Sequence, residues 1–559
     1  MANALPPTNR CSLRARRQYP ECPMPTPGAI AKRMYAGVVI ALVGCGSAGG
    51  SPSGDGGGND APAGDFTVML DRTSLTLPIA GSGTVTVTVQ RTGAVGEIRL
   101  TASGLAPVSV AFNPNPIPAS ATTSQATISI AGGSVPTTTS ITVTGLSDAR
   151  QHTTTLSVTS TTITVTGTIR GNRSGIKVGI VGRQSVTSGA GGVFMFTDVT
   201  PPYDLYTFAD GGNPMAPTPT VFLFDDLTRP DPIVSAPATD ISAIAPCLPP
   251  RTCAQSAVTG TRTGARNNTD DIVFGWTGPA ASFSGGVLNT DGTYSGTIRW
   301  NPGADNAGVL HALQFTRRPS GAPNTFVGYA RSAQTTARDG VATTINLAAT
   351  AVTSTAMLSG TITGPSGYPM PSISLVQQFG TTQAVLWTTR TTSTVDATFP
   401  LIAAAGGTSL FASVSAADGS GTSSFVQPLT GTVAVNFTMP TAAVLSLPAD
   451  AATGVAAFTH FTWTSAPSMI NELNISTVGT NRASYRIFTM ARDATIPVVP
   501  ELTFPADQDF SWRVNGYGPN ASIDDAAAAS ELEIATSSDY QGPPHAFTTM
   551  SGRTFHSAP

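Results

Sequence analysis

Hydrophobic and polar residues alternate strictly in many short runs of this chain. In residues 84–89 (TVTVTV), valine occupies every second position and threonine the positions between. Residues two apart lie on the same face of a β-strand, so this run predicts a strand with one buried and one exposed face. Similar runs at 97–104, 126–130, 140–145 and 154–160 have the spacing of a β-sandwich.

A second pattern is a heptad that is written three times. The stretches are VTGTIRG at 165–171, VTGTRTG at 258–264 and LSGTITG at 358–364, and their central glycines are 93 and then 100 residues apart. Each heptad has an inward glycine, which lets a bulky side chain from the opposite sheet approach closely. An aromatic strand follows each heptad, at 187–208, 290–300 and 396–407. The pattern predicts similar modules in a row; the alternative is chance recurrence in a chain rich in Thr and Gly.

Three segments resemble known families of non-catalytic β-sandwiches. Residues 66–160 resemble the bacterial Ig-like module, and 445–467 resembles the opening of fibronectin-III-like or Ig-like modules. Residues 163–238 resemble the carboxypeptidase regulatory-like, or transthyretin-like, module. That resemblance rests on six positions of its aromatic strands: Gly192, Phe194, Phe196, Val199, Tyr203 and Leu205. The resemblances imply prealbumin-like and Ig-like sandwiches that do no chemistry of their own.

The expected fold class is all-β, with tandem Ig-like and prealbumin-like β-sandwiches after a signal peptide and a disordered Gly/Ser tether. The expected segments are a leader and lipoprotein signal peptide at 1–44, a tether at 45–65 and five sandwiches. By resemblance these are an Ig-like sandwich at 66–160, carboxypeptidase regulatory-like sandwiches at 163–238 and 356–440, a sandwich at 239–355 that is a candidate for the same module, and a fibronectin-III-like or Ig-like sandwich at 441–559. The sandwich at 239–355 is the least family-like, and the last one ends in a frayed tail. Trp463 and Trp512 are expected in the core of that last sandwich.

Composition supports the all-β prediction and excludes one class of partner. Of 559 residues only 11% are charged, against roughly a quarter in ordinary soluble domains, while 57 are Gly and 44 are Pro. Thr suits a pleated strand, and Gly and Pro suit turns. The chain has two lysines, Lys32 and Lys177, and a net charge of −3. Nucleic-acid binding needs clustered cations, so nucleic acid is excluded as an expected partner.

The N-terminal region has the pattern of a lipoprotein signal. Lys32 and Arg33 precede a short apolar run that ends in LVGC at 42–45. The run is too short to span a bilayer. Its end resembles the bacterial lipobox, and this resemblance implies cleavage before Cys45 and lipid attachment to that cysteine. Initiation at Met24 would remove the long polar leader. A chance cysteine after a buried strand is the alternative.

The segment after Cys45 predicts how the folded part is held. Residues 46–65 contain no aliphatic side chain larger than Ala before the folded part starts near Phe66, so they are expected to form a flexible tether. Gly46 is not the Asp that retains lipoproteins at the inner membrane in well-studied envelopes. The resemblance therefore implies a protein anchored in the cell envelope, and it favours the outer membrane.

Two further cysteines flank a proline-stiffened loop. Cys247 and Cys253 enclose LPPRT, and a disulfide between them fits an oxidising compartment. Free thiols are the alternative. No other Cys remains after cleavage and no His lies near in sequence, which argues against a zinc site.

Enzyme signatures are absent from the sequence. It contains neither HExxH nor GxSxG, and its five histidines are scattered singly. His311 and His460 alternate with apolar residues, so half-exposed strand positions are expected for both. Paired aspartates at 225–226, 270–271 and 524–525 offer candidate calcium ligands, although Asp is also common in turns.

The sequence therefore predicts a non-catalytic, lipid-anchored envelope protein for display, spacing or adhesion, with no cofactor other than a candidate structural calcium. Its expected partners are the membrane, through the anchor, and envelope proteins or polysaccharide. The alternatives are a carbohydrate-binding surface lipoprotein, with Trp276, Trp300 and Trp387 stacking on sugar rings, and a surface hydrolase with its site in 239–355.

Overall fold

The computed structural model describes residues 64–148, 150–210, 218–237, 253–265, 271–279, 281–316, 325–369, 371–380, 382–390, 394–400, 408–418, 421–479, 483–529, 545–550 and 552–559. The chain divides after residue 62, and all described residues belong to the second unit, residues 63–559. These residues form β-strands joined by turns, two 3-10 turns, η1 (Arg170–Asn172) and η2 (Ala190–Gly192), and one short helix, α1 (Ile523–Ala529). The all-β prediction is confirmed.

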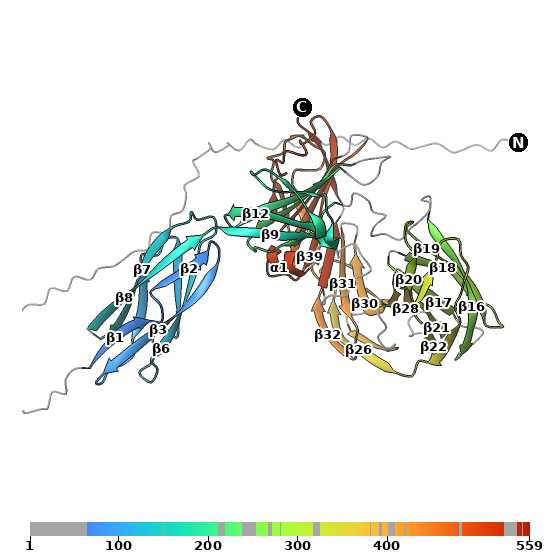
Figure 1. Ribbon diagram of the computed structural model, residues 1–559, viewed down its shortest axis with the longest axis horizontal. Helices are drawn as coiled ribbons and strands as arrows, with labels where there is room; N and C mark the ends of the chain where they lie inside the picture. Colours follow the sequence, from blue (N-terminus) through green and yellow to red (C-terminus); the bar gives the residue numbers. More distant parts are fainter. Residues whose placement is uncertain are drawn as a thin grey trace, which may run out of the picture. The chain divides into compact units, whose positions relative to one another are not determined.

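The first folded part is a two-layer sandwich (Figure 1). In β3 (Ser82–Thr92), the three valines of the TVTVTV run are buried and its threonines are exposed or half-buried, as predicted. One layer has the order β1-β3-β6-β5, with β1 (Asp65–Leu70), β6 (Thr123–Ile130) and β5 (Val108–Asn113). The other has the order β2-β8-β7-β4, with β2 (Ser74–Pro78), β8 (Arg150–Thr161), β7 (Thr138–Ser147) and β4 (Arg99–Ser103).

The three heptads occupy equivalent strands, which supports the module prediction over chance. They lie in β9 (Ile163–Ile169), β16 (Ala254–Gly264) and β26 (Thr355–Thr363). Each pairs antiparallel with the aromatic strand that follows it: β12 (Val193–Val199), β19 (Thr293–Trp300) and β29 (Thr394–Pro400). Each also pairs in parallel with a later strand of its range: β15 (Ile233–Val234), β24 (Thr343–Thr344) with β25 (Leu347–Ala351), and β32 (Val433–Thr438).

The heptad glycines make room for a neighbour, but not in the way expected from the sequence. Gly167 pairs directly with Phe194, and a Cβ on Gly167 would lie 2.2 Å from the end of that ring. Gly260 pairs in the same way with Tyr294. The rings come from the adjacent strand of the same sheet rather than from the opposite sheet, so that part of the prediction is wrong.

Replacing Gly167 by Ala should destabilise the fold by about 2 kcal/mol, because the new methyl group forces the Phe194 ring out of its place. The free energy of unfolding, measured by chemical denaturation, checks this. Gly96→Ala is the matched control, since a Cβ at Gly96 would meet nothing within 4 Å. Equal effects of the two substitutions would contradict the packing argument.

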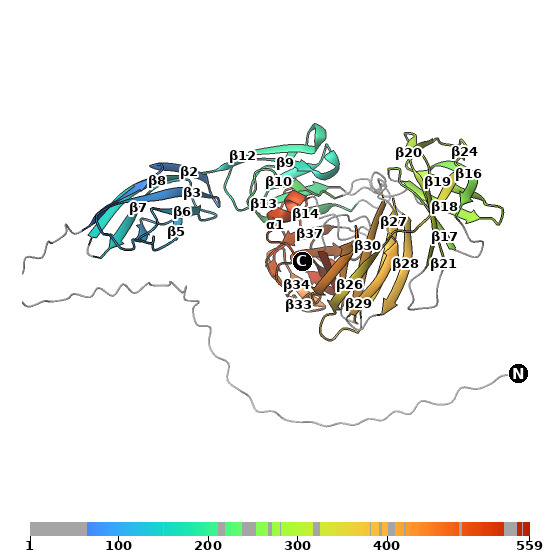
Figure 2. The same ribbon diagram turned by 90° about the horizontal axis from the view of Figure 1, so that it is seen from below.

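A fourteen-stranded sheet connects three of the expected sandwich ranges. It joins strands of 163–238 to strands of 441–559 through the parallel pair β14 (Thr220–Leu227) and β37 (Ser484–Thr489), which lie side by side in Figure 2. It then reaches strands of 356–440 through the antiparallel pair β40 (His545–Met550) and β31 (Gly421–Pro428). The expected domain boundaries remain predictions, but backbone hydrogen bonds join the range 441–559 to both of the other two ranges.

The remaining strands of this sheet complete the order β11-β10-β13-β14-β37-β36-β39-β40-β31-β30-β27-β28, with β34 and β41 beside it. They are β10 (Lys177–Ile180), β11 (Val186–Thr187), β13 (Tyr203–Ala209), β27 (Ser372–Phe379), β28 (Thr382–Arg390), β30 (Thr408–Ala417), β34 (Ala452–Val455), β36 (Ile470–Thr477), β39 (Asp509–Gly518) and β41 (Arg553–Ser557).

Smaller sheets supply the second layers. The sheets β12-β9-β15 and β29-β26-β32 hold the first and third heptads, and β33 (Val444–Leu447), β35 (Phe461–Thr464) and β38 (Asp493–Ala494) form another. Trp463 and Trp512 are buried between this last sheet and the long one, as predicted.

The range 239–355 forms its own eight-stranded sheet with the order β17-β21-β22-β25-β16-β19-β18, and β24 also pairs with β16. Its further strands are β17 (Asp271–Trp276), β18 (Ala281–Leu288), β21 (Leu310–Thr316) and β22 (Thr325–Arg331), with β20 (Asn306–Gly308) and β23 (Thr335–Ala337) pairing nearby.

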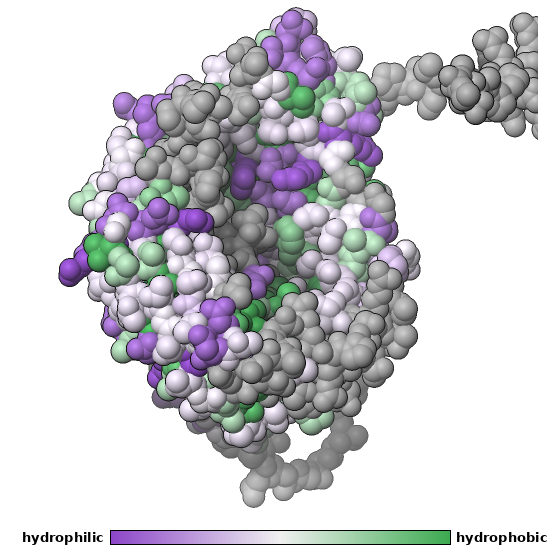
Figure 3. Space-filling view, turned by 90° about the vertical axis from the view of Figure 1, so that its right-hand side faces the viewer, coloured by the Kyte–Doolittle hydropathy of each residue, from purple (hydrophilic) through white to green (hydrophobic). Residues whose placement is uncertain are grey.

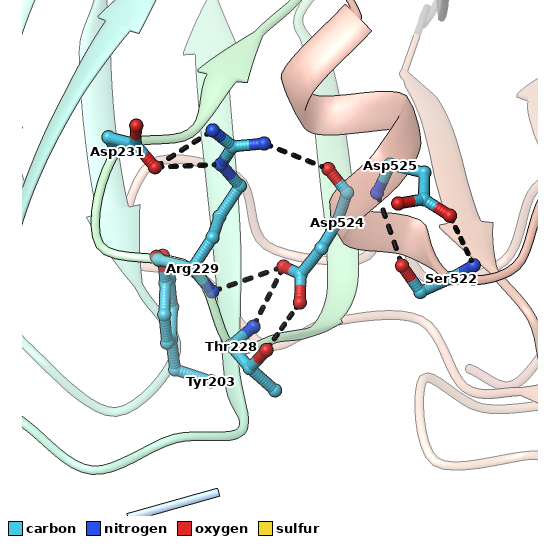
Figure 4. A network of polar contacts seen from close by, with 7 residues as sticks. All are labelled: Tyr203, Thr228, Arg229, Asp231, Ser522, Asp524 and Asp525. Carbon is cyan, nitrogen blue, oxygen red and sulfur yellow. Dashed lines mark hydrogen bonds and ion pairs between the residues drawn. The ribbon is translucent and has the colours of Figure 1, made fainter. Parts of the chain in front are cut away.

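The helix α1 fastens the C-terminal range to the loop after β14 (Figure 4). The Asp524 carboxylate accepts hydrogen bonds from the backbone N–H of Thr228 (2.9 Å) and of Arg229 (3.1 Å), and from the Thr228 hydroxyl. Arg229 in turn donates to the Asp524 carbonyl oxygen. Ser522 and Asp525 cap the helix by exchanging hydrogen bonds between side chain and backbone. Both aspartates of this pair are thus engaged in holding the helix.

Candidate functional site

The expected lipid and disulfide positions are only partly within the described residues. Cys45 and Cys247 lie outside them, so lipid attachment at Cys45 stays a prediction. Cys253 lies just before β16 and is disulfide-bonded. Its pairing with Cys247 also stays a prediction.

Two of the three tryptophans expected to stack on sugar rings are core residues. Trp276 is buried and donates its indole N–H to the Asn306 side-chain oxygen at 2.7 Å. Trp300 is buried and donates to the carbonyl oxygen of Ala304 at 2.7 Å. A buried ring offers no face to a sugar, so this prediction is wrong for both. The side chain of Trp387 lies outside the described residues.

His311, expected in a half-exposed position, is completely buried. Its Nδ1 lies 2.8 Å from the Tyr329 hydroxyl, and its ring stacks on Phe379 of β27 with centroids 5.2 Å apart. Gly275, directly opposite His311 on β17, leaves the space that Phe379 fills. Burial, and then the positive charge of Arg331, lower the pKa of His311 to about 4. His460, by contrast, is exposed and contacts Asp493.

The paired aspartates have three different environments. Asp270 and the side chain of Asp271 lie outside the described residues, and Asp524 and Asp525 hold α1. Asp225 and Asp226 gather with Asp204, with one carboxylate oxygen of each within 4.8 Å of the others. Burial, and then the negative charge of Asp204, raise the pKa of Asp225 to about 7. Three such carboxylates suit a calcium ion, and calcium here stays a prediction.

Asp204 and Asp225 line a hollow of about 440 Å³ on one face of the joint between β14 and β37. Leu223 and Ile487, which pair across the joint, form part of its floor. Phe458, with 82% of its surface exposed, also lines it. These groups would suit a cation, but nothing else in the structure points to a ligand.

A second hollow, of about 550 Å³, lies on the opposite face of the same joint. Successive side chains of a strand point to opposite faces, so Thr220 and Phe222 face this side together with their partners Ser484 and Arg486. The other described lining residues are Thr218, Pro237, Ser476, Thr477, Gly479 and Ala483. Hydroxyl groups thus dominate the wall, and one arginine supplies its charge.

Two contacts fix the guanidinium of Arg486, and the second residue is itself held by two hydrogen bonds. The guanidinium lies over the Phe222 ring, 5.2 Å from the centroid, and 3.5 Å from a carboxylate oxygen of Glu472. Glu472 is buried, and its other oxygen accepts hydrogen bonds from the Asn515 amide at 2.9 Å and from the Tyr517 hydroxyl. The side chain of Arg486 keeps 39% of its surface exposed. Neither Phe222 nor Arg486 stands out in the sequence, because strands far apart in the chain bring them together.

Only 11% of the residues of this chain are charged. On the face drawn in Figure 3, hydrophilic and hydrophobic residues lie in small groups among residues of intermediate hydropathy. Such a surface follows from a chain in which Thr, Ser and Gly replace charged residues. Among the described residues, no helix has both the length and the apolar character needed to cross a membrane.

No family model and no curated protein matches this chain. Among solved structures, it is similar to domains 4 and 5 of the S-layer protein SbsC, with 16% identity over 17% of this chain and a TM-score of 0.14. It is also similar to the Bacillus anthracis TIE protein, with 8% identity, coverage of 66% of this chain and 73% of that one, and a TM-score of 0.21. The chain spans about half of the SbsC fragment. At these TM-scores the similarities carry no argument about function.

Proposed function

We propose that this protein is a non-catalytic component of a bacterial cell envelope, anchored at the outer membrane through lipid on Cys45, that serves display, spacing or adhesion. The observation that carries the proposal is the sheet that runs without interruption from β11 to β28. Backbone hydrogen bonds across its two joints link three of the expected modules into a stiff body, which suits a protein that presents a binding surface at a distance from the membrane.

The surroundings of the four histidines whose side chains the structure describes also favour a non-catalytic role over the hydrolase alternative. The imidazole of His311 is buried, with a tyrosine hydroxyl at its Nδ1, and so cannot meet a substrate that arrives from solvent. His152 and His556 form surface pairs with aspartates, as His460 does. A hydrolase proposal would need a positioned nucleophile beside one of these pairs.

Replacing Cys45 by Ser should abolish lipid attachment and release the protein from membranes. Labelling of cells with a radioactive fatty acid, followed by membrane fractionation, measures both effects. Cys253→Ser is the control, because Cys253 is disulfide-bonded and should not change labelling. Equal labelling of the Cys45→Ser variant and the parent protein would refute the anchor. Protease treatment of intact cells then reports which way the folded part faces.

Carbohydrate binding is the second candidate function, and the hydroxyl-lined hollow beside Arg486 favours it. Hydroxyl and planar charged groups in a concave site are suited to sugar recognition. The aromatic rings first expected to do this, Trp276 and Trp300, are unsuited because they are buried.

A further inference from the structure

We propose that the hollow formed by Thr220, Phe222, Ser484 and Arg486 binds a carbohydrate that bears a carboxylate, such as a uronic acid unit of an envelope polysaccharide. This inference rests on the second candidate function and names its ligand class. It does not depend on the lipid anchor.

The size and wall of the hollow fit a sugar of one or two rings. Its volume of about 550 Å³ lies within the range of small-molecule sites. Five of its ten described lining residues carry a hydroxyl group: Thr218, Thr220, Ser476, Thr477 and Ser484. Hydroxyls both donate and accept hydrogen bonds, as do the hydroxyls of a sugar. Three of them are already oriented. Thr220 donates to the Thr218 carbonyl oxygen, the Ser476 hydroxyl pairs with that of Ser511, and the Thr477 hydroxyl accepts a hydrogen bond from the Ala483 N–H at 2.9 Å.

The charge of the hollow selects a carboxylate. Arg486 is the ionisable residue among the described lining, and no described acidic side chain lines the hollow. A planar guanidinium matches a carboxylate through two parallel hydrogen bonds. A phosphate-rich ligand would call for several cations, and a neutral sugar would offer no charge to the part of the guanidinium that Glu472 leaves exposed.

Arg486 is ordered before any ligand binds. The ring of Phe222 supports one face of the guanidinium, and Glu472 holds one edge. The Glu472 contact is long, at 3.5 Å, and Glu472 already accepts two hydrogen bonds at its other oxygen. It therefore orients Arg486 without occupying all of the guanidinium N–H donors. Pre-ordering of this kind lowers the entropy cost of binding.

The test is titration calorimetry of the full-length protein with disaccharides of galacturonate, mannuronate and guluronate, each compared with its methyl ester. The esters keep the sugar ring but remove the negative charge. At least one free acid should bind at least tenfold more tightly than its ester. Arg486→Gln should lower the affinity for that acid at least tenfold. Equal binding of acid and ester, no binding of any acid, or binding unchanged in Arg486→Gln would overturn the proposal.

Arg513→Gln is the matched control. Arg513 is exposed on the same face of the sheet, since both arginines pair in register with Asn474, one on each side. This variant should bind within twofold of the parent protein, and a tenfold loss would point to general charge attraction and overturn the assigned site.

Arg486→Gln leaves the buried Glu472 charge unpaired, which destabilises the fold. A second variant separates loss of binding from loss of folding. The double variant Glu472→Gln/Arg486→Gln removes both charges, and it should fold and still lose binding. Retained binding in a folded double variant would overturn the proposal. Lipid labelling of Cys45 is a separate readout, so failure of the anchor and failure of this site are distinguishable.

Discussion

Lowering the pH from 7 to 4 should cost the protein about 3 kcal/mol of stability through His311 alone. Its pKa is about 4 in the folded chain, well below the ordinary value of 6.5, because the ring is buried and Arg331 lies near. Between these two pKa values the His311 imidazole is protonated in the unfolded chain but remains neutral in the folded chain. The contribution of neutral His311 to the free energy of unfolding is therefore fully present above pH 6.5, and it is lost progressively as the pH falls to 4. Denaturant midpoints measured at several pH values check this expectation.

His311→Phe isolates the effect from the titration of other groups. A phenyl ring keeps the stack on Phe379 but cannot be protonated. Between pH 6.5 and pH 4, this variant should lose about 3 kcal/mol less stability than the parent protein loses. His460→Gln is the control, because it removes an exposed histidine and leaves the buried ring of His311 in place. If the stability of His311→Phe and of the parent protein depended on pH in the same way, His311 would not be the source of the effect.

Replacing Asp524 by Ala should destabilise the joint between α1 and the loop after β14 by about 3 kcal/mol, roughly 1 kcal/mol for each of the three hydrogen bonds lost. The Thr228 and Arg229 N–H groups would lose their acceptor, and α1 its fixed position over the core that holds Ile523 and Ala527. Chemical denaturation and the rate of proteolysis near the C-terminus measure the effect.

The neighbouring Asp525 provides the comparison. Among the described residues, its carboxylate accepts from the backbone N–H groups of Ala521 and Ser522, the two residues just before its own helix. Asp525→Ala should therefore cost about 1 kcal/mol, the usual value of a helix cap. If both variants lost the same stability, α1 would be held by its own caps rather than by the contact with β14.

Local patterns in the sequence predicted the strands well. Alternation in TVTVTV placed three valines in the first core, and the repeated heptads occupy equivalent strands with the same neighbours. These features depend on residues close in sequence, or on side chains that alternate with the pleat. The six positions that resemble the carboxypeptidase regulatory-like module are likewise buried in the structure.

The candidate site could not be predicted in this way. Arg486 and Phe222 meet only because β14 and β37 pair in parallel, and no local pattern encodes which distant strand a given edge will choose. The burial of His311 has the same origin. Its alternation with apolar residues favoured a half-exposed face, but Phe379 from another range covers that face. Trp276 and Trp300 were misjudged because Asn306 and Ala304 satisfy their indole N–H groups inside the core.

The pairing of β14 with β37 also sets the order in which the chain can mature. The N-terminal part of the chain is synthesised first, so the edge of β14 stays unpaired until β37, encoded much later in the chain, has been made. An open edge of this kind attracts strands of other molecules until it is covered. Folding of the last range, which contains β37, therefore protects the edge of β14 from such pairing. Truncated chains that lack this range should aggregate rather than accumulate as shorter soluble proteins.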